Sequence, residues 1–291
     1  MYTTLIEPAE LAAPLTHEAA DWVVVDCRFD LARPEWGAAA YAAGHVPSAS
    51  YAHLDHDLSG PVSPTTGRHP LPSPDRLAET FGAWGIDASV QVVAYDQGNG
   101  AHASRLWWLL KWAGHQKVAV LNGGFAAWQQ AGLPTETTVR QRQPRKFTFR
   151  AGGERVVSTA ELERAVRDGT LASGAAVLVD ARAADRFAGE NETIDPVAGH
   201  IPGARNHPFA RNVDAHGRFL PAAQLRERWT ATLGAGAARR GAVVAMCGSG
   251  VTACHNLLAL EIAGLGGAQL YAGSWSEWIR SPERPVAKGA A

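Results

Sequence analysis

Short apolar runs alternate with helix-like stretches along the first half of the chain. Residues 22–25, 91–95 and 118–121 are apolar almost throughout and rich in β-branched side chains, which is typical of strands buried on both faces. Residues 104–113, between the last two runs, have the composition of a helix that Gly114 ends. Strands that alternate with helices in this way predict a mainly parallel sheet.

The second half repeats the same order. Residues 177–179 and 242–246 predict two further buried strands, and a helix is expected at residues 252–263, ended by Gly264. We therefore expect an α/β fold in which each mainly parallel sheet is flanked by helices on both faces.

Four short motifs occur twice, in the same order and roughly 150 residues apart, which is about the size of one domain. The pairs are residues 25–28 with 179–182, 44–49 with 199–204, 92–96 with 243–247, and 122–128 with 272–278. One such pair could arise by chance, but four in register indicate a duplication.

The duplication fixes the expected domain boundaries. A chain of 291 residues has the length of two domains. We place the first domain at residues 1–137 and the second at 156–291. The linker between them, residues 138–155, carries six basic side chains and is expected to be solvated, with an anion-binding role as the alternative.

Composition excludes several classes of protein. A net charge of -1 argues against a nucleic-acid partner, which requires a basic excess. The first residues lack the basic start and apolar core of a signal peptide, and no apolar run reaches the roughly 20 residues of a membrane span. We expect a cytoplasmic protein with no membrane partner, in a reducing compartment that keeps thiols available.

The residue with the clearest chemistry is Cys247. It ends a predicted strand and precedes Gly248-Ser249-Gly250-Val251-Thr252, where a helix begins. Glycines let backbone N–H groups turn inward, and the helix dipole favours negative charge. We expect a reactive thiolate, open to solvent, that can carry a sulfur atom as a persulfide. The alternative is a small buried apolar cysteine.

Other reactive residue types have plainer interpretations. Asp96 stands at the position of Cys247 in the first half, and because a carboxylate cannot take up sulfur, we expect the first domain to be non-catalytic. Cys254 and Cys27 are expected to be packed thiols, with a resolving role as the alternative for Cys27.

The histidines near these motifs have expected roles of their own. His45 and His200 recur in both halves, so we expect each to bond a backbone group. His53 and His56 have a spacing that a metal could use, but no third ligand is evident. We expect no metal and no cofactor.

The chain resembles the rhodanese superfamily over nearly its whole length. The resemblance rests on residues 199–203, 247–252 and 273–278. It implies two tandem rhodanese-like domains with the catalytic cysteine only in the second. The cysteine-bearing motif is similar to that of 3-mercaptopyruvate sulfurtransferases, whereas thiosulfate-preferring members usually place basic residues at the positions of Gly248 and Ser249.

The resemblance also implies a two-step reaction. A thiolate takes a sulfur atom from 3-mercaptopyruvate, or alternatively from thiosulfate, and then passes it to a thiol or to cyanide. Thioredoxin and glutathione are among the candidate acceptors.

Further site residues follow from the resemblance. Arg186 matches a substrate-binding arginine, whose fork suits a carboxylate or sulfonate; the alternative is a surface salt bridge to Asp185 or Glu190. Asp55 and His69 match first-domain residues that act together with the loop serine, Ser249, which requires the two domains to face each other. The resemblance implies that substrate also contacts the loop residues Gly248, Gly250, Val251 and Thr252.

The chain departs from the family at one position. Mercaptopyruvate enzymes often carry a second arginine nine residues after the first, and here that position is Asp195. Arg182, Arg205 and Arg105 are candidates to replace the absent arginine.

Two other functions compete with sulfur transfer. A cysteine phosphatase needs a longer loop that ends in an arginine, but the residue six positions after Cys247 is Ala253. A non-enzymatic sulfur carrier is the second alternative, because a persulfide can form without turnover.

Overall fold

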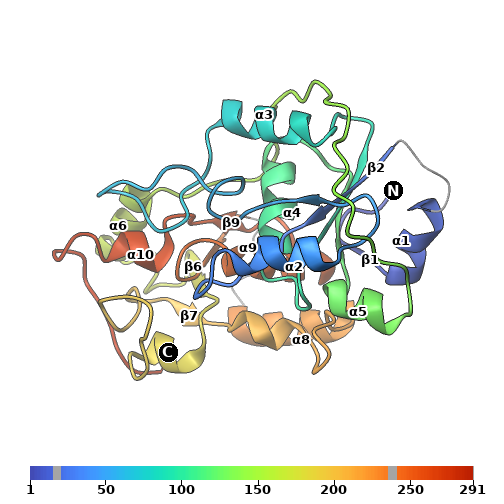
Figure 1. Ribbon diagram of the computed structural model, residues 1–291. Coiled ribbons are helices and arrows are strands. Elements are labelled where there is room, and N and C mark those ends of the chain that lie inside the picture. The colour runs from blue at the N-terminus through green and yellow to red at the C-terminus, as the bar shows by residue number, and fades with distance from the viewer. Residues whose placement is uncertain (16–20, 235–240, 291) are drawn as a thin grey trace. The chain divides into compact units, whose positions relative to one another are not determined.

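The computed structural model describes residues 1–15, 21–234 and 241–290, and these divide into two compact units (Figure 1). Unit 1 comprises Met1–Gly60, Leu71–Gly153 and Val213–Phe219. Unit 2 comprises Pro61–Pro70, Glu154–Asn212 and Leu220–Ala291. Each unit thus includes a short segment from the other half of the sequence. The expected boundaries at residues 137 and 156 miss this exchange, because hydrophobic patterning does not indicate where a loop packs.

The predicted linker is part of unit 1 up to Gly153. The Arg145 N–H donates to the Gly82 carbonyl over 2.9 Å, and the buried ring of Phe147 packs edge-on against Phe81. The Arg142 guanidinium donates to the backbone carbonyl of Trp22. Most residues of the segment are exposed, as expected of a solvated linker, but the segment also packs against unit 1 and buries Phe147.

Unit 1 contains a five-stranded parallel sheet in the order β1-β5-β4-β2-β3. Its strands are β1 (Leu5–Ile6), β2 (Trp22–Asp26), β3 (Ser50–Tyr51), β4 (Gln91–Tyr95) and β5 (Val118–Leu121). The three longest agree closely with the predicted apolar runs. Because β2, β4 and β5 are central, both their faces are buried, and this explains why their sequences do not alternate.

Helices cover both faces of this sheet. They are α1 (Pro8–Leu15), α2 (Trp36–Ala43), α3 (Pro74–Ala83), α4 (Ala103–Trp112) and α5 (Gly124–Gln130). Leu11 of α1, Tyr41 of α2 and Trp128 of α5 pack with Val24 and Val93 in one core cluster. Helix α4 packs against β4 and β5 without joining that cluster, so it covers the opposite face.

Unit 2 repeats the arrangement with a four-stranded parallel sheet in the order β7-β6-β8-β9. Its strands are β6 (Val177–Asp180), β7 (Arg205–Asn206), β8 (Val243–Met246) and β9 (Gln269–Leu270). An isolated parallel bridge between Val156 and Leu270 takes the place that β1 has in unit 1. The predicted α/β fold with two mainly parallel sheets is confirmed.

The helices of unit 2 also cover both faces of its sheet (Figure 1). They are α6 (Thr159–Arg167), α7 (Ala184–Ala188), α8 (Ala222–Leu233), α9 (Thr252–Ile262) and α10 (Ser274–Trp278), with a 3₁₀ turn at Phe209–Asn212. Helix α6 begins with a capping box, in which Ser158 and Glu161 each bond the other's backbone N–H. Leu162, Phe187 and Trp275 pack on one face, and α9 packs on β8 and β9 from the other.

The duplication extends to individual hydrogen bonds. Arg28 makes a bidentate pair with Asp26 and donates to the Gly44 carbonyl. In unit 2, Arg182 makes the same bonds with Asp180 and with the carbonyl of Gly199. These buried pairs fix the ends of β2 and β6.

The repeated histidines also have matching contacts. His45 Nδ1 lies 2.8 Å from the Tyr41 carbonyl oxygen, and His200 Nδ1 lies 2.9 Å from that of Phe187. Each ring stacks on the aromatic side chain of the same partner residue. The expected backbone-bonding role of both histidines is confirmed.

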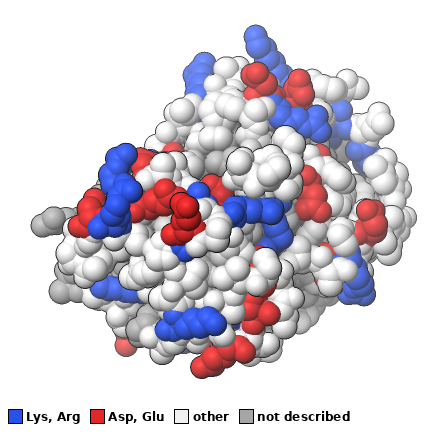
Figure 2. Space-filling view, turned by 90° about the vertical axis from the view of Figure 1, so that its left-hand side faces the viewer, with Lys and Arg blue, Asp and Glu red and all other residues white. Residues whose placement is uncertain are grey.

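The surface mixes charges of both signs. On the face that Figure 2 shows, blue basic and red acidic side chains are interspersed, in keeping with the net charge of -1. Among the helices that the structure describes, none is long and apolar enough to cross a bilayer.

Candidate functional site

Most of the residues predicted to carry chemistry lie in unit 2, around the carboxyl edge of its sheet. Cys247 directly follows the central strand β8, and Thr252 begins α9. The segment between them, residues 247–252, is called the cysteine loop below. Gly250 has a φ of 78°, and its N–H donates to Cys247 Sγ over 3.1 Å. A backbone donor is therefore directed at the sulfur, as the loop sequence predicts.

The first residues of α10 hold the cysteine loop in place through hydrogen bonds. Cys247 N–H donates to Ser274 Oγ over 3.0 Å. The Trp275 N–H donates to the Cys247 carbonyl over 3.0 Å, and the Ser276 N–H donates to the Gly248 carbonyl over 2.9 Å. Because these backbone bonds are made by a helix packed into the core, the loop is preorganised around the sulfur.

Cys247 is only 2% exposed, so the expectation of a thiol open to solvent is wrong. The neighbouring loop residues Ser249 and Val251 are also buried. Hydrogen bonds to a charged group are stronger where water is excluded. A buried sulfur next to a backbone N–H is consistent with an anion-binding loop.

The matching loop of unit 1, residues 96–100, has the same backbone hydrogen bond at its start, but Asp96 stands at the position of Cys247. Phe125 N–H donates to the Asp96 carbonyl over 2.8 Å, as Trp275 does to Cys247. The Asp96 carboxylate accepts backbone hydrogen bonds from four residues, namely Gly98, Gly100, His102 and Ala103. This loop thus provides its own anion, and its inward N–H groups are already used.

His69 and Ser249, predicted to act together, are in contact within unit 2. His69 Nδ1 lies 2.7 Å from Ser249 Oγ, and both side chains are buried. His69 belongs to the exchanged segment Pro61–Pro70, so it lies in unit 2 although its sequence precedes the linker. The segment approaches closely at Gly67, where an added Cβ would lie 2.5 Å from the Gly273 carbonyl oxygen. Asp55 belongs to unit 1, and its role stays a prediction.

Arg186 has acidic partners that the sequence interpretation did not foresee. Its guanidinium donates to Glu192 over 2.8 Å and to Asp195 over 3.1 Å. Asp185 bonds only its backbone N–H. The alternative of a salt bridge to Asp185 or Glu190 is therefore wrong.

Arg68 is a site residue that sequence reasoning missed. Its Nη1 pairs with the carboxylate oxygen of Asp195 that Arg186 does not use. A Cβ added at Gly248 would lie 3.0 Å from Arg68 Nη2 and 3.9 Å from both terminal nitrogens of Arg186. Two guanidiniums therefore converge on the cysteine loop. The only signal in the sequence was that Arg68 directly precedes His69.

The three arginines considered as replacements have other partners. Arg182 is paired with Asp180, and its side chain is only 1% exposed. Arg205 donates to the carbonyls of Thr232 and Leu233 near the end of α8. Arg105 is a buried residue of unit 1 that donates to the Leu58 carbonyl. Within the described ranges, Arg68 is the arginine that shares Asp195 with Arg186.

The remaining cysteines are packed thiols, as expected. Cys27 is 1% exposed, and burial raises the pKa of its thiol well above the ordinary value, with Asp26 and Asp96 adding to the effect. A resolving role for Cys27 is disfavoured because its thiolate is hard to form. Cys254 is fully buried, and its thiol donates to the Gly250 carbonyl over 3.3 Å.

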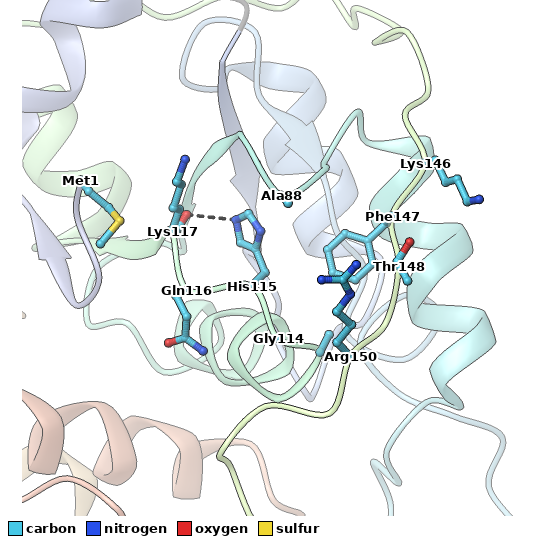
Figure 3. Close-up of a pocket in the computed structure, with 11 residues that line it drawn as sticks. Met1, Ala88, Gly114, His115, Gln116, Lys117, Lys146, Phe147, Thr148 and Arg150 are labelled. Carbon is cyan, nitrogen blue, oxygen red and sulfur yellow. Dashed lines mark hydrogen bonds between the residues drawn. The ribbon is translucent and has the colours of Figure 1, made fainter.

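Unit 1 contains a separate pocket of about 340 Å³, drawn in Figure 3. His115 Nε2 lies 3.2 Å from the Lys117 carbonyl oxygen there, and burial lowers the pKa of this histidine. Lys117 donates to the Ser89 carbonyl. The pocket contains none of the residues predicted to be catalytic. We therefore assign the candidate active site to the cysteine loop of unit 2.

His53 and His56 stack with 4.3 Å between ring centroids. Where the structure describes the chain, no cluster of three or more His, Cys, Asp or Glu side chains is arranged to bind a metal ion.

The chain is similar to proteins of known family. The model of the rhodanese-like domain matches residues 7–131 and 158–281. A Pseudomonas aeruginosa protein named probable 3-mercaptopyruvate sulfurtransferase is 48% identical, covering 98% of each chain. A thiosulfate sulfurtransferase of Gallus gallus is 32% identical over 82% of this chain and 80% of its own. The solved structure of 3-mercaptopyruvate sulfurtransferase from Leishmania major is 32% identical, with a TM-score of 0.83, and covers 98% of this chain and 76% of that one.

Proposed function

The chain belongs to the rhodanese-like family of sulfurtransferases, and we propose that it transfers sulfur from 3-mercaptopyruvate to an acceptor through a persulfide on Cys247. The observation that carries this proposal is the Gly250 N–H directed at Cys247 Sγ over 3.1 Å. A loop whose backbone dipoles favour a thiolate also favours a persulfide anion, because both place negative charge within the same loop.

In the first step, the Cys247 thiolate attacks the sulfur of mercaptopyruvate. An S–S bond forms and the donor's C–S bond breaks, and its electron pair goes to carbon as the enolate of pyruvate. That carbon takes up one proton, equivalent to the proton of the donor thiol. The products are a Cys247 persulfide anion and pyruvate.

His69 and Ser249 suit the proton and charge changes of this step. The donor's ketone oxygen gains negative charge as the enolate forms, so a hydroxyl directed at it lowers the barrier. Ser249 can donate that hydrogen bond, because His69 Nδ1 lies 2.7 Å from its oxygen and can accept or return a proton. Asp55 is proposed as a further member of this group, as the family resemblance implies.

Arg68 and Arg186 suit the carboxylate of the donor. Both present guanidinium nitrogens toward Gly248, and Arg186 Nη1 and Arg68 Nη2 make no hydrogen bond within the described part of the chain. A planar carboxylate can accept from two guanidiniums at once. The donor's reactive sulfur would then lie over the cysteine loop, whose backbone at Gly248, Gly250, Val251 and Thr252 forms the floor of the site.

In the second step, a thiol attacks the outer sulfur of the persulfide. The Cys247 thiolate leaves and the acceptor becomes a persulfide; cyanide would leave as thiocyanate in the same way. Thioredoxin and glutathione are thiol acceptors of suitable chemistry. A reducing compartment such as the cytoplasm would keep Cys247 available for the next cycle.

Thiosulfate is the second candidate donor. Its sulfonate oxygens also suit the two guanidiniums, and the Gallus gallus relative is named a thiosulfate sulfurtransferase. The thiolate would attack the outer sulfur, and sulfite would leave with the electron pair of the broken S–S bond.

Mass spectrometry of the intact protein tests the proposal. After incubation with mercaptopyruvate, we expect a mass gain of one sulfur atom that a thiol reductant removes. Cys247→Ser should show no gain, whereas Cys254→Ser should show the full gain. Repeated turnover with excess thiol would separate an enzyme from a sulfur carrier. If neither mercaptopyruvate nor thiosulfate adds sulfur at Cys247, the proposal fails.

A further inference from the structure

We propose that Asp195 makes this site selective for a monoanionic sulfur donor over a dianionic one. The inference rests on the proposed function, since it concerns the donor of that reaction. It gives a role to a buried carboxylate that the proposed reaction does not otherwise use.

Asp195 joins the two arginines that face the cysteine loop. One carboxylate oxygen pairs with Arg68 Nη1 and the other lies 3.1 Å from Arg186 Nη2. The side chain of Asp195 is 2% exposed, whereas those of Arg68 and Arg186 are 26% and 17% exposed. The carboxylate therefore lies behind the guanidiniums, which approach Gly248 of the cysteine loop.

The charges around the donor site cancel. Glu192 pairs with Arg186, and its side chain is likewise 2% exposed. Burial alone would raise the pKa of Glu192, but hydrogen bonds from Arg186 and from backbone N–H groups lower it overall, so Glu192 is ionised at neutral pH. Arg68 and Arg186 thus face the loop with two carboxylates immediately behind them. Arg182 Nη1 also lies 3.4 Å from Glu192, but Arg182 adds no net charge because Asp180 neutralises it.

The negative charge of Asp195 acts with different strength on the two candidate donors. The Coulomb energy between Asp195 and a bound donor is twice as large for a dianion as for a monoanion at the same distance. Mercaptopyruvate carries one carboxylate, and thiosulfate carries two negative charges. The carboxylate of Asp195 therefore raises the energy of bound thiosulfate more, while it keeps both guanidiniums in place for either donor.

The test compares the ratio of the two catalytic efficiencies, with mercaptopyruvate and with thiosulfate, rather than the activity with either donor alone. We would measure kcat/KM for mercaptopyruvate and for thiosulfate in the wild type, Asp195→Asn and Asp195→Glu. In Asp195→Asn the ratio should shift toward thiosulfate by about tenfold, the size of one partly screened charge interaction. Asp195→Glu keeps the charge, so its ratio should stay near that of the wild type even if both efficiencies fall. Glu190→Gln, which removes an exposed carboxylate of the same segment, is the matched control.

A loss of positioning alone would lower both efficiencies without changing their ratio. An unchanged ratio in Asp195→Asn, or an equal shift in Asp195→Glu, would overturn the inference. A salt series adds a second readout, because the shift should shrink as ionic strength rises.

Binding calorimetry separates this inference from the proposed function. Sulfate and pyruvate serve as a non-reacting dianion and monoanion. Asp195→Asn should gain affinity for sulfate relative to pyruvate by a similar factor, whether or not the wild type turns over either donor. If turnover is absent but this gain is observed, the proposed function fails and the charge selectivity stands; if the gain is absent, the selectivity fails.

Discussion

The thiol of Cys254 donates to the carbonyl oxygen of Gly250, with 3.3 Å between the two atoms. In unit 1, the hydroxyl of Ser104 donates to the Gly100 carbonyl over 2.6 Å. Gly250 and Gly100 both have a φ of 78°, and in each case the donor is the residue four positions later. The two halves therefore use the same side-chain bond to fix the turn from loop to helix.

Cys254→Ser should keep both stability and activity, because serine makes this bond at the matching position in unit 1. Cys254→Ala removes this thiol hydrogen bond to the Gly250 carbonyl and should lower the free energy of unfolding by about 1 kcal/mol. Urea unfolding of both variants, beside donor turnover, checks this. If Cys254→Ser were less stable than Cys254→Ala, the hydrogen bond to the Gly250 carbonyl would not explain the residue type at this position.

Gly250→Ala should abolish sulfur transfer. A left-handed φ strains any residue with a Cβ, and here the Cβ would also lie 2.4 Å from the Ala272 carbonyl oxygen. Gly174→Ala is the matched control, since Gly174 has a φ of 73° with open space around the added carbon. We expect the control to lose about 1 kcal/mol of stability and to retain its turnover. Equal loss of activity in both variants would mean that backbone strain alone, not crowding at the loop, is responsible.

The long buried strands and the duplication could be predicted because each depends on local sequence. Strands β2 and β4 lie inside their sheet, and runs of β-branched residues like theirs are typical of strands buried on both faces. The short strands β1, β3, β7 and β9, of two residues each, were not predicted because two residues show no hydrophobic periodicity.

The two arginines that face the cysteine loop could not both be identified from the sequence. Arg186 and Cys247 were identified from motifs, but Arg68 is separated from Asp195 by 127 positions. Only the packing of the segment Pro61–Pro70 into unit 2 brings them together. The burial of Cys247 was missed for a similar reason, since the residues that enclose a loop lie far from it in sequence.

Ser249→Ala and His69→Asn should each discriminate between donors. Mercaptopyruvate leaves as an enolate that needs a hydrogen bond and a proton, whereas sulfite leaves as a stable anion. We expect mercaptopyruvate turnover to fall by about a hundredfold and thiosulfate turnover to change by less than about threefold. Steady-state kinetics with both donors provides the measurement, and parallel losses with both donors would remove the assigned role.

Arg186→Ala should raise the KM for both donors by about tenfold or more while the fold stays intact, because its guanidinium is partly exposed and faces the loop. Arg68→Ala should behave in the same way. Arg182→Ala is the contrasting case: it leaves the buried Asp180 unpaired and should lower the free energy of unfolding by about 3 kcal/mol or more. Circular dichroism and donor kinetics together distinguish the two classes. An unchanged KM in Arg186→Ala would exclude it from donor binding.

The burial of His207 leads to a prediction of how the free energy of unfolding of unit 2 depends on pH. The ring is fully buried and stacks on Trp229, with Nδ1 lying 2.7 Å from Thr232 Oγ1. Burial lowers the pKa of His207 to about 4, from an ordinary value of 6.5. Between these two values the unfolded chain binds a proton and the folded chain does not. The contribution of neutral His207 to stability is therefore fully present above about pH 6.5 and is lost as the pH falls toward 4.

The size of this loss can be isolated with His207→Gln, which cannot take up a proton. Acidification from about pH 7 to about pH 4.5 should cost the wild type on the order of 2 to 3 kcal/mol more than it costs the variant. Carboxylates elsewhere titrate in both proteins and cancel in the comparison. Calorimetric unfolding of the two proteins at each pH gives the difference. Because His207 lies in a network with Asn212 and Trp229, the variant starts from lower stability at neutral pH, so the wild-type and variant curves should converge on acidification. Parallel curves would show that His207 takes up a proton as readily in the folded chain as in the unfolded one, so that its burial does not set this part of the pH dependence.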